Sequence, residues 1–238
     1  MTDTFIQITK ASIAQKFYSV APGRLQYALH KRRFRRNIEA WIDAPCFMLH
    51  VPKCGGKSIA AALNLPDPGH TIISDMPAEI RQKLSKKPCI VVVRDPIDRI
   101  VSTFKFAHRH IAEGRNRTFA GLINSNDNDI NDFIEQNLTT HLRDTRHFFR
   151  DASSFVDAAK AVGMQPELVD FKTLEKGCRQ FFAKYQIHVD EIPRINVSDA
   201  RSGLNLSLSR EAKEKVASLY QRDVALYKLA HQHEPEQQ

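Results

Sequence analysis

Cysteine is scarce in this sequence, and its spacing suggests no crosslink. The chain of 238 residues has four cysteines, at positions 46, 54, 89 and 178. They form no CxxC pair, and no histidine stands at zinc-finger spacing from them. A disulfide framework and a structural metal site are therefore not expected. We predict a reducing, cytoplasmic environment and buried thiols at Cys46 and Cys89, which lie in apolar segments.

Long hydrophobic runs are also missing. Residues 1–17 lack the apolar core of a signal peptide. No apolar run approaches the roughly 18 residues that a membrane span needs. We therefore expect a soluble chain with neither a signal peptide nor a membrane anchor.

Neither an internal repeat nor a linker divides the chain. Hydrophobic residues make up 42% and charged residues 26%, which is an ordinary globular composition. We predict a single domain over residues 1–238, with a helical basic extension (1–45), a core (46–230) and a frayed polar tail (231–238).

Positive charge is in excess. The formal net charge is +8 and the pI is about 9.4, which favours anionic ligands such as nucleotides, nucleic acid, acidic membranes or acidic glycans. The densest basic run is Lys31–Arg36. It is either a solvated helix face or a surface for peripheral contact with an acidic partner or membrane.

Strand and helix signals alternate along the core. The apolar, β-branched run at 89–93 predicts a strand buried on both faces, as in a parallel sheet. Shorter runs predict strands at 46–51 and 168–171. Helices are predicted from 58, over 77–86, 97–110 and 174–185, and from 209 towards 230, with Ser209 as a cap. The pattern indicates a three-layer α/β fold with a central, mainly parallel sheet flanked by helices.

The segment 50–58, which reads HVPKCGGKS, has the composition of an anion-binding loop. Its adjacent glycines let successive backbone N–H groups face one point, and a helix N-terminus follows. Lys53 and Lys57 add positive charge, and Ser58 adds a hydroxyl donor. The pattern predicts a cradle sized for phosphate or sulfate.

The segment 94–102, which reads RDPIDRIVS, is the second phosphate candidate. Arg94 directly follows the predicted strand 89–93 and can bind phosphate through two parallel hydrogen bonds. Ser102 lies about two helical turns further on. Charges at 98 and 99 are also compatible with solvated positions at a helix end. In a parallel sheet both segments would lie at the carboxyl ends of strands, where such folds bind ligands.

Together the two motifs resemble the sulfotransferases that use 3'-phosphoadenosine 5'-phosphosulfate (PAPS), especially the carbohydrate-modifying branch. The family's first loop has the form P-K-[TC]-[GA]-[GT]-[TS]-[ST], which residues 52–58 follow except at Lys57. Its second motif, R-[DE]-P-x-x-R-x-x-S, is matched by residues 94–102 at every fixed position. The likeness continues more loosely over residues 45–230. It implies a P-loop-like fold and a soluble, bacterial-like member of that branch.

The resemblance also implies roles for individual residues. Arg94 and Ser102 would bind the 3'-phosphate, and Lys53 would neutralise the leaving phosphate oxygen. Lys57 departs from the family's usual Thr or Ser, which affects the fine geometry of the loop. The 5'-phosphosulfate would be held by Pro52, Lys53, Cys54, Gly55, Gly56, Lys57 and Ser58. The implied partner is a hydroxyl acceptor on a glycan or glycolipid, with no nucleic acid and no metal.

A histidine near neutral pH is the usual base for removing an acceptor proton. We favour His70, which lies in a short loop between the two motifs, where carbohydrate sulfotransferases look similar. Asp75 is a candidate either to orient His70 or to act as the base itself. The other candidates are His50, which we interpret as a packed core residue, His108 and His110 as surface or acceptor-site groups, and His141, which with Arg143 is a candidate lining of the acceptor pocket.

Two other functions stay open. One is a P-loop nucleotide kinase, because Gly56-Lys57-Ser58 matches the end of the Walker pattern. Against it, the first Walker glycine would fall on Val51, and the strand 89–93 is followed by Arg94 where a kinase needs an acid for magnesium. The other is a non-catalytic polyanion-binding module based on the Lys31–Arg36 run.

Overall fold

The computed structural model describes residues 36–113, 123, 128–195 and 203–232. Among these residues a single parallel sheet lies at the centre, with strand order β1-β2-β3. Its strands are β1 (Phe47–Leu49), β2 (Cys89–Val93) and β3 (Pro166–Asp170). The predicted strands are confirmed, although the third begins two residues earlier than its apolar run.

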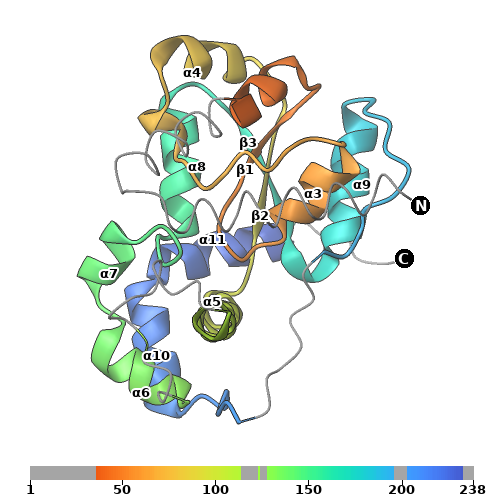
Figure 1. Cartoon of the computed structure of the whole chain (residues 1–238). Helices are drawn as coiled ribbons and strands as arrows, with labels where there is room; N and C mark the ends of the chain where they lie inside the picture. Colours follow the sequence, from red (N-terminus) through yellow and green to blue (C-terminus); the bar gives the residue numbers. More distant parts are fainter. Residues whose placement is uncertain (1–35, 114–122, 124–127, 196–202, 233–238) are drawn as a thin grey trace.

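Strand β2 lies in the middle of the sheet, and all five of its residues are buried. Figure 1 shows α8 on one side of the strands and α3 and α9 on the other. Because both faces are covered, the strand is apolar throughout instead of alternating with polar residues. The α/β architecture predicted from the sequence is therefore confirmed.

Helices and short 3₁₀ turns connect and cover the strands. The helices predicted from 58 and over 77–86, 97–110 and 174–185 are found with bounds that differ by at most two residues. Three helices between residues 130 and 161 were not predicted individually. In chain order they are a helix over 36–43, α3 (Gly56–Ala62), η1 (Ile73–Asp75), α4 (Ala78–Leu84), α5 (Pro96–Ala112), α6 (Ile130–Asn137), α7 (Thr140–Thr145), α8 (Ala152–Ala161), η3 (Phe171–Thr173), α9 (Leu174–Lys184), α10 (Arg210–Leu219) and α11 (Gln221–Gln232).

The C-terminal helix is broken where the sequence predicts continuity. Ser209 caps α10 as expected, since its hydroxyl accepts from the amide of Ala212 at 3.0 Å. The chain leaves helical geometry at Tyr220, whose buried hydroxyl donates to the carbonyl of Phe149 at 2.7 Å. The break lets α10 pack on α5 and α6 while α11 packs on β2, β3 and α8. One straight helix would not reach both surfaces.

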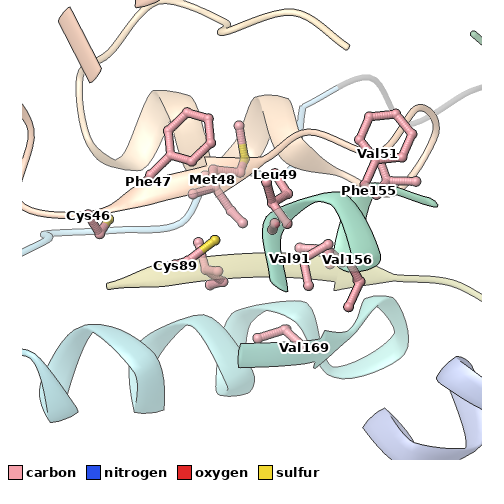
Figure 2. Close-up of a cluster of buried hydrophobic side chains, with 14 of the residues drawn as sticks. Cys46, Phe47, Met48, Leu49, Val51, Cys89, Val91, Phe155, Val156 and Val169 are labelled. Atoms are coloured by element: carbon pink, nitrogen blue, oxygen red, sulfur yellow. The ribbon is translucent and has the colours of Figure 1, made fainter. Parts of the chain in front are cut away.

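Two groups of buried apolar side chains hold these layers together. The larger surrounds the sheet, and Figure 2 shows side chains from all three strands and from α8 meeting in it. The smaller lies between α5, α6, α7 and α10. All four thiols are free and buried, as predicted for Cys46 and Cys89.

The ends of the chain are described only in part. Residues 31–35 of the basic run and residues 233–238 of the tail lie outside the described residues, so the division into extension, core and tail stays a prediction. Within residues 36–43, Trp41 is fully buried and donates to the carbonyl of Pro66 at 2.8 Å. No helix in the described part of the chain is both long and apolar enough to cross a membrane.

Candidate active site

The loop after β1 has a backbone that few sequences can adopt. Lys53 and Gly55 both have left-handed φ angles, 66° and 81°. Gly56, at the start of α3, has no space for a side chain, because a Cβ there would lie 2.3 Å from Cδ2 of His50. The glycines predicted to curl this loop are therefore required, Gly55 for its φ angle and Gly56 for close contact.

Donor groups of this loop lie at the carboxyl edge of the sheet. As in any helix, the first amides of α3 have no partner within the helix, and no backbone acceptor for the amides of Gly56 and Lys57 occurs among the described residues. Lys57 is exposed. Ser58 is buried, and its Oγ accepts from the amide of Ile195 at 3.3 Å, which leaves its own O–H to donate.

Arg94 follows β2 and lies beside this loop, as expected for neighbouring parallel strands. Its Nη1 donates to the carbonyl of Lys53 at 3.2 Å, and its guanidinium lies 4.3 Å from the ring centroid of Phe171. Its Nε is buried and has no hydrogen-bond partner among the described residues. Buried donors normally have partners, so Arg94 is held ready to donate to a further acceptor.

Lys53 lies within a group of positive charges. Its Nζ is 4.2 Å from the ring centroid of Phe106 on α5, and the guanidinium of Arg109 is 5.4 Å from the same centroid. Burial, together with repulsion from Arg109, Arg94 and Lys57, lowers the pKa of Lys53 to about 8. No carboxylate is among the main charges acting on Lys53. An anion bound here would relieve this repulsion.

Helix α5 carries the other predicted phosphate ligand. Ser102 is buried and lies one turn before Phe106, and therefore on the same side of the helix. No hydrogen bond joins Ser102 to Arg94 among the described residues. The structure thus places Ser102 on the same side of α5 as Phe106, the ring that Lys53 of the first loop contacts.

His70 is held in one orientation against the strand end. Its Nδ1 donates to the carbonyl of His50 at 2.9 Å, so Nε2 is the bare nitrogen of the neutral ring. Burial, followed by the charge of His50, lowers the pKa of His70 to about 3. The ring centroids of Phe148 and His147 lie 5.7 and 5.8 Å away.

Two phenylalanines connect the predicted base to the predicted lysine. Phe148 lies beside His70, Phe106 lies beneath Lys53, and the two phenyl centroids are 5.1 Å apart. A chain of contacts through the two rings therefore connects His70 to Lys53. The strand ends, the face of α5 and the segment after α7 together form a site with clustered cations, a neutral histidine and two half-buried phenylalanine rings.

The comparison with known families agrees with this geometry. A family model described as "Sulfotransferase family" matches residues 43–230, which is most of the chain. The chain belongs to the sulfotransferase family. Searches among curated proteins and among solved structures gave no match. The family predicted from the two motifs is thereby confirmed, at the level of sulfotransferases in general.

In this sulfotransferase the remaining candidate histidines occupy different places. His50 is buried, as predicted, and donates to Asp67. His108 is buried, and its ring centroid lies 4.5 Å from that of Phe104. Of the two predicted positions, surface or acceptor site, the surface is therefore wrong for it. The ring of His110 lies tilted against Phe106, with 3.9 Å between the ring centroids.

Three further candidates have surroundings of their own. His141 is exposed. Arg143 donates to the carbonyl of Leu219 at 3.0 Å and lines a separate pocket of about 210 Å³ between α7 and the α10–α11 junction. Asp75 is exposed, and its carboxylate accepts from the hydroxyl of Ser74. The group that fixes His70 is instead the carbonyl of His50.

The sequence did not predict the segment after α7 that contacts His70. His147 and Phe148 stand in no recognisable motif, and they are far in sequence from both phosphate segments. Their only signal is an aromatic run after a short helix, which is equally typical of core packing. Only the tertiary fold shows that they meet His70.

Two observations bear on metal chemistry in the sulfotransferase. The described residues contain no group of three or more His, Cys, Asp or Glu side chains arranged to hold a metal ion. Asp95, the acid nearest the end of β2, caps α5 by accepting from the amides of Ile97 and Asp98 at 2.8 and 3.2 Å.

Cys54 lies in the loop between Lys53 and Gly55. Burial raises the pKa of its thiol to about 11, so this thiol is protonated near neutral pH.

Proposed function

We propose that this sulfotransferase transfers a sulfuryl group from PAPS to a hydroxyl group of a carbohydrate. The observation that carries the proposal is the group of cations around Lys53 at the adjoining ends of β1 and β2. Asp95 and Asp98 act on Arg94, but no carboxylate is among the main charges acting on Lys53 itself. Arg94 adds a buried Nε with no partner among the described residues. This is the electrostatic environment that a highly anionic donor requires.

Each part of the donor has candidate ligands in the structure. The 5'-phosphosulfate would bind the loop Pro52–Ser58, where backbone amides and lysines are available. The 3'-phosphate would bind Arg94 and Ser102, as the resemblance to the family implies. Phe171, already stacked against Arg94, lies next to this position and keeps the guanidinium oriented.

The transfer is an in-line displacement at sulfur. The acceptor oxygen forms a bond to sulfur while the bond between sulfur and the bridging phosphate oxygen breaks, and the electron pair stays on that phosphate oxygen. Lys53 neutralises the charge that develops there. The acceptor hydroxyl gives its proton to Nε2 of His70, the bare nitrogen in the orientation that the His50 carbonyl fixes.

The environment of His70 suits a base that works only when the donor is bound. In the free protein its pKa of about 3 keeps the ring neutral but makes it a weak base. A bound polyanion nearby favours the protonated form and moves this pKa towards the working pH. Proton transfer is thereby coupled to the presence of donor.

A carbohydrate acceptor fits the surface beside these groups. Phe106 and Phe148 are half-buried neighbours, one beside Lys53 and the other beside His70. Aromatic rings pack well on the less polar faces of sugars, and we expect the exposed part of Phe148 to offer such a contact. The resemblance to the carbohydrate branch favours a glycan or glycolipid over nucleic acid. A cytoplasmic location and peripheral contact of Lys31–Arg36 with an acidic membrane are further parts of this proposal.

The first test is calorimetric titration with 3',5'-adenosine bisphosphate, the product that PAPS leaves, beside ATP with magnesium. We expect the bisphosphate to bind and Arg94→Ala to abolish binding. Arg179→Ala is the matched control, because Arg179 is an exposed arginine of α9 paired with Glu175. Transfer of ³⁵S from labelled PAPS to a panel of polysaccharides then tests the acceptor class.

Three outcomes would contradict the proposal. Binding of ATP with magnesium alone would favour the kinase. Binding of neither nucleotide would favour a polyanion module. Bisphosphate binding that Arg94→Ala and Arg179→Ala weaken equally would remove Arg94 from the donor site.

A further inference from the structure

The carboxylate of Asp67 contacts two groups next to the candidate base in sequence or in space. Its Oδ1 accepts from Nδ1 of His50 at 2.7 Å and from the amide of Gly69 at 2.8 Å. Burial would raise its pKa, but the hydrogen bond from His50 holds the pKa of Asp67 well below its usual range. The carboxylate therefore stays ionised and fixes both the His50 ring and the turn that leads into His70.

His50 contacts both the candidate base, His70, and the first loop. Its carbonyl accepts the Nδ1 proton of His70 at 2.9 Å, and the two imidazole centroids are 4.1 Å apart. The His50 ring also restricts the first loop sterically, because it lies directly against Gly56. One residue thus joins the loop proposed to hold the donor to the side chain proposed to accept the proton.

This arrangement selects one tautomer of His70. A carbonyl oxygen can only accept, so the contact with His50 requires the proton of His70 on Nδ1 and leaves Nε2 bare. If the turn around Gly69 shifts, the ring loses this contact and the proton is free to occupy Nε2. A histidine with Nε2 protonated cannot accept a proton at that atom.

We infer that Asp67 and His50 are positioning residues that hold His70 in the Nδ1-protonated tautomer and in a fixed position relative to the loop Pro52–Ser58. The inference rests on the proposed function for its catalytic consequence, but the tautomer itself is a property of the free protein. Neither residue needs to touch the donor or acceptor. Asp75, a candidate from sequence either to orient His70 or to act as the base, is exposed and accepts from the hydroxyl of Ser74 instead.

The tautomer can be read directly by NMR. In protein labelled with ¹⁵N-histidine, the long-range proton–nitrogen spectrum distinguishes a protonated ring nitrogen from a bare one, and His70→Gln assigns the signals. We expect wild-type His70 to be neutral with its proton on Nδ1. Asp67→Ala should lose this pattern, whereas Asp67→Asn, which keeps an acceptor oxygen in the same place, should preserve it. Asp75→Asn should leave it unchanged.

The kinetic readout separates positioning from a general loss of structure. For Asp67→Ala we expect kcat to fall by roughly tenfold to a hundredfold, as for other outer partners that fix a histidine tautomer. The affinity for 3',5'-adenosine bisphosphate, measured by calorimetry, should change less than about twofold. Asp67→Asn should recover most of kcat. A proportional loss of bisphosphate-binding sites and kcat in Asp67→Ala would indicate misfolding and overturn the positioning role.

The outcomes distinguish this inference from the proposed function. A wild-type His70 with its proton on Nε2 would overturn the inference without any variant, even if His70→Gln abolishes transfer. An unchanged tautomer in folded Asp67→Ala would also overturn it. If the tautomer is as expected but His70→Gln retains full transfer, the base proposed above is wrong while the contacts described here stand.

Discussion

Arg99 and Asp223 form an ion pair that is enclosed by the protein. Nη2 of Arg99 donates to Oδ2 of Asp223 at 3.1 Å, and their side chains are 1% and 2% exposed. Asp223 also accepts from the amides of Ala152 and Ser153 at 2.8 and 2.9 Å, and Arg99 donates to the carbonyl of Arg150. One buried pair therefore joins α5, the start of α8 and α11.

Breaking this pair should destabilise the fold strongly. Asp223→Ala leaves a buried guanidinium without its counter-charge and two amides without their acceptor, and such changes cost about 3–5 kcal/mol. Urea unfolding should show a loss of this size. Glu214→Ala, which breaks the exposed pair of Glu214 with Arg210 on α10, should cost less than about 1 kcal/mol. A loss below about 1 kcal/mol for Asp223→Ala would show that the pair is not structurally important.

The second motif illustrates what could be predicted from sequence. The strand 89–93 was predictable because its apolar composition on both faces follows from burial, and Arg94 at its end follows from parallel topology. The role of Arg99 was not predictable, since a solvated helix end has the same local sequence. Its partner Asp223 is 124 residues away, and no local pattern encodes a pairing at that separation.

The candidate site likewise has one part that local sequence predicts and another that depends on tertiary contacts. Gly55 and Gly56 mark the anion loop locally, because the turn itself needs glycine. The tautomer of His70 depends on a carbonyl 20 residues earlier, and the contact with Phe148 depends on how the segment after α7 packs. The break at Tyr220 likewise reflects two different packing surfaces. Helix propensity carries no information about these tertiary contacts.

Gly56 offers a steric test of the loop. In Gly56→Ala the new Cβ would lie within 2.3 Å of the His50 ring, so either the ring or the loop must move. We expect binding of 3',5'-adenosine bisphosphate to weaken at least about tenfold, because the loop amides lose their alignment. Gly163→Ala is the control: it places a side chain at a φ of 85° but in open space.

The Gly163 control separates stability from binding. Gly163→Ala should lower the free energy of unfolding by about 1–2 kcal/mol through backbone strain while leaving bisphosphate affinity unchanged. If Gly56→Ala binds the bisphosphate as tightly as wild type, the loop does not hold the donor in the conformation described.

The low pKa of His70 makes the protein sensitive to acid. The pKa is about 3 in the folded state against an ordinary value of 6.5, so the unfolded chain takes up this proton first as the pH falls. The free energy of unfolding should therefore decrease from about pH 7.5 downwards, with a slope that approaches about 1.4 kcal/mol per pH unit for this group below about pH 6. Above about pH 7.5 the group should contribute almost no slope.

His70→Gln isolates this contribution from those of the carboxylates. Urea unfolding of both proteins between pH 7 and pH 4.5 should show a shallower decline for the variant. Parallel curves would mean that His70 titrates normally in the folded protein. In that case its ring is not buried against His50 as the structure places it.

Because of Lys53, donor binding should weaken as the pH rises into the alkaline range. Its pKa of about 8 in the free protein means that most molecules carry the charge at pH 7 and few carry it at pH 9. If only the protonated form binds the anion well, the affinity for 3',5'-adenosine bisphosphate should fall about tenfold between these pH values. Binding near pH 8.5 should also take up protons, which calorimetry in buffers of different ionisation enthalpy detects.

Lys53→Arg is the matched variant for this prediction, because a guanidinium stays charged throughout the range. Its affinity for the bisphosphate should be nearly constant from pH 7 to pH 9, and its binding should take up no protons. Titration of the bisphosphate itself affects both proteins equally and cancels in the comparison. A wild-type affinity that is as constant as that of Lys53→Arg would place Lys53 outside the donor site. The leaving phosphate oxygen would then need another cation, and Arg109, which contacts the same Phe106 ring and acts most strongly on Lys53, is a candidate.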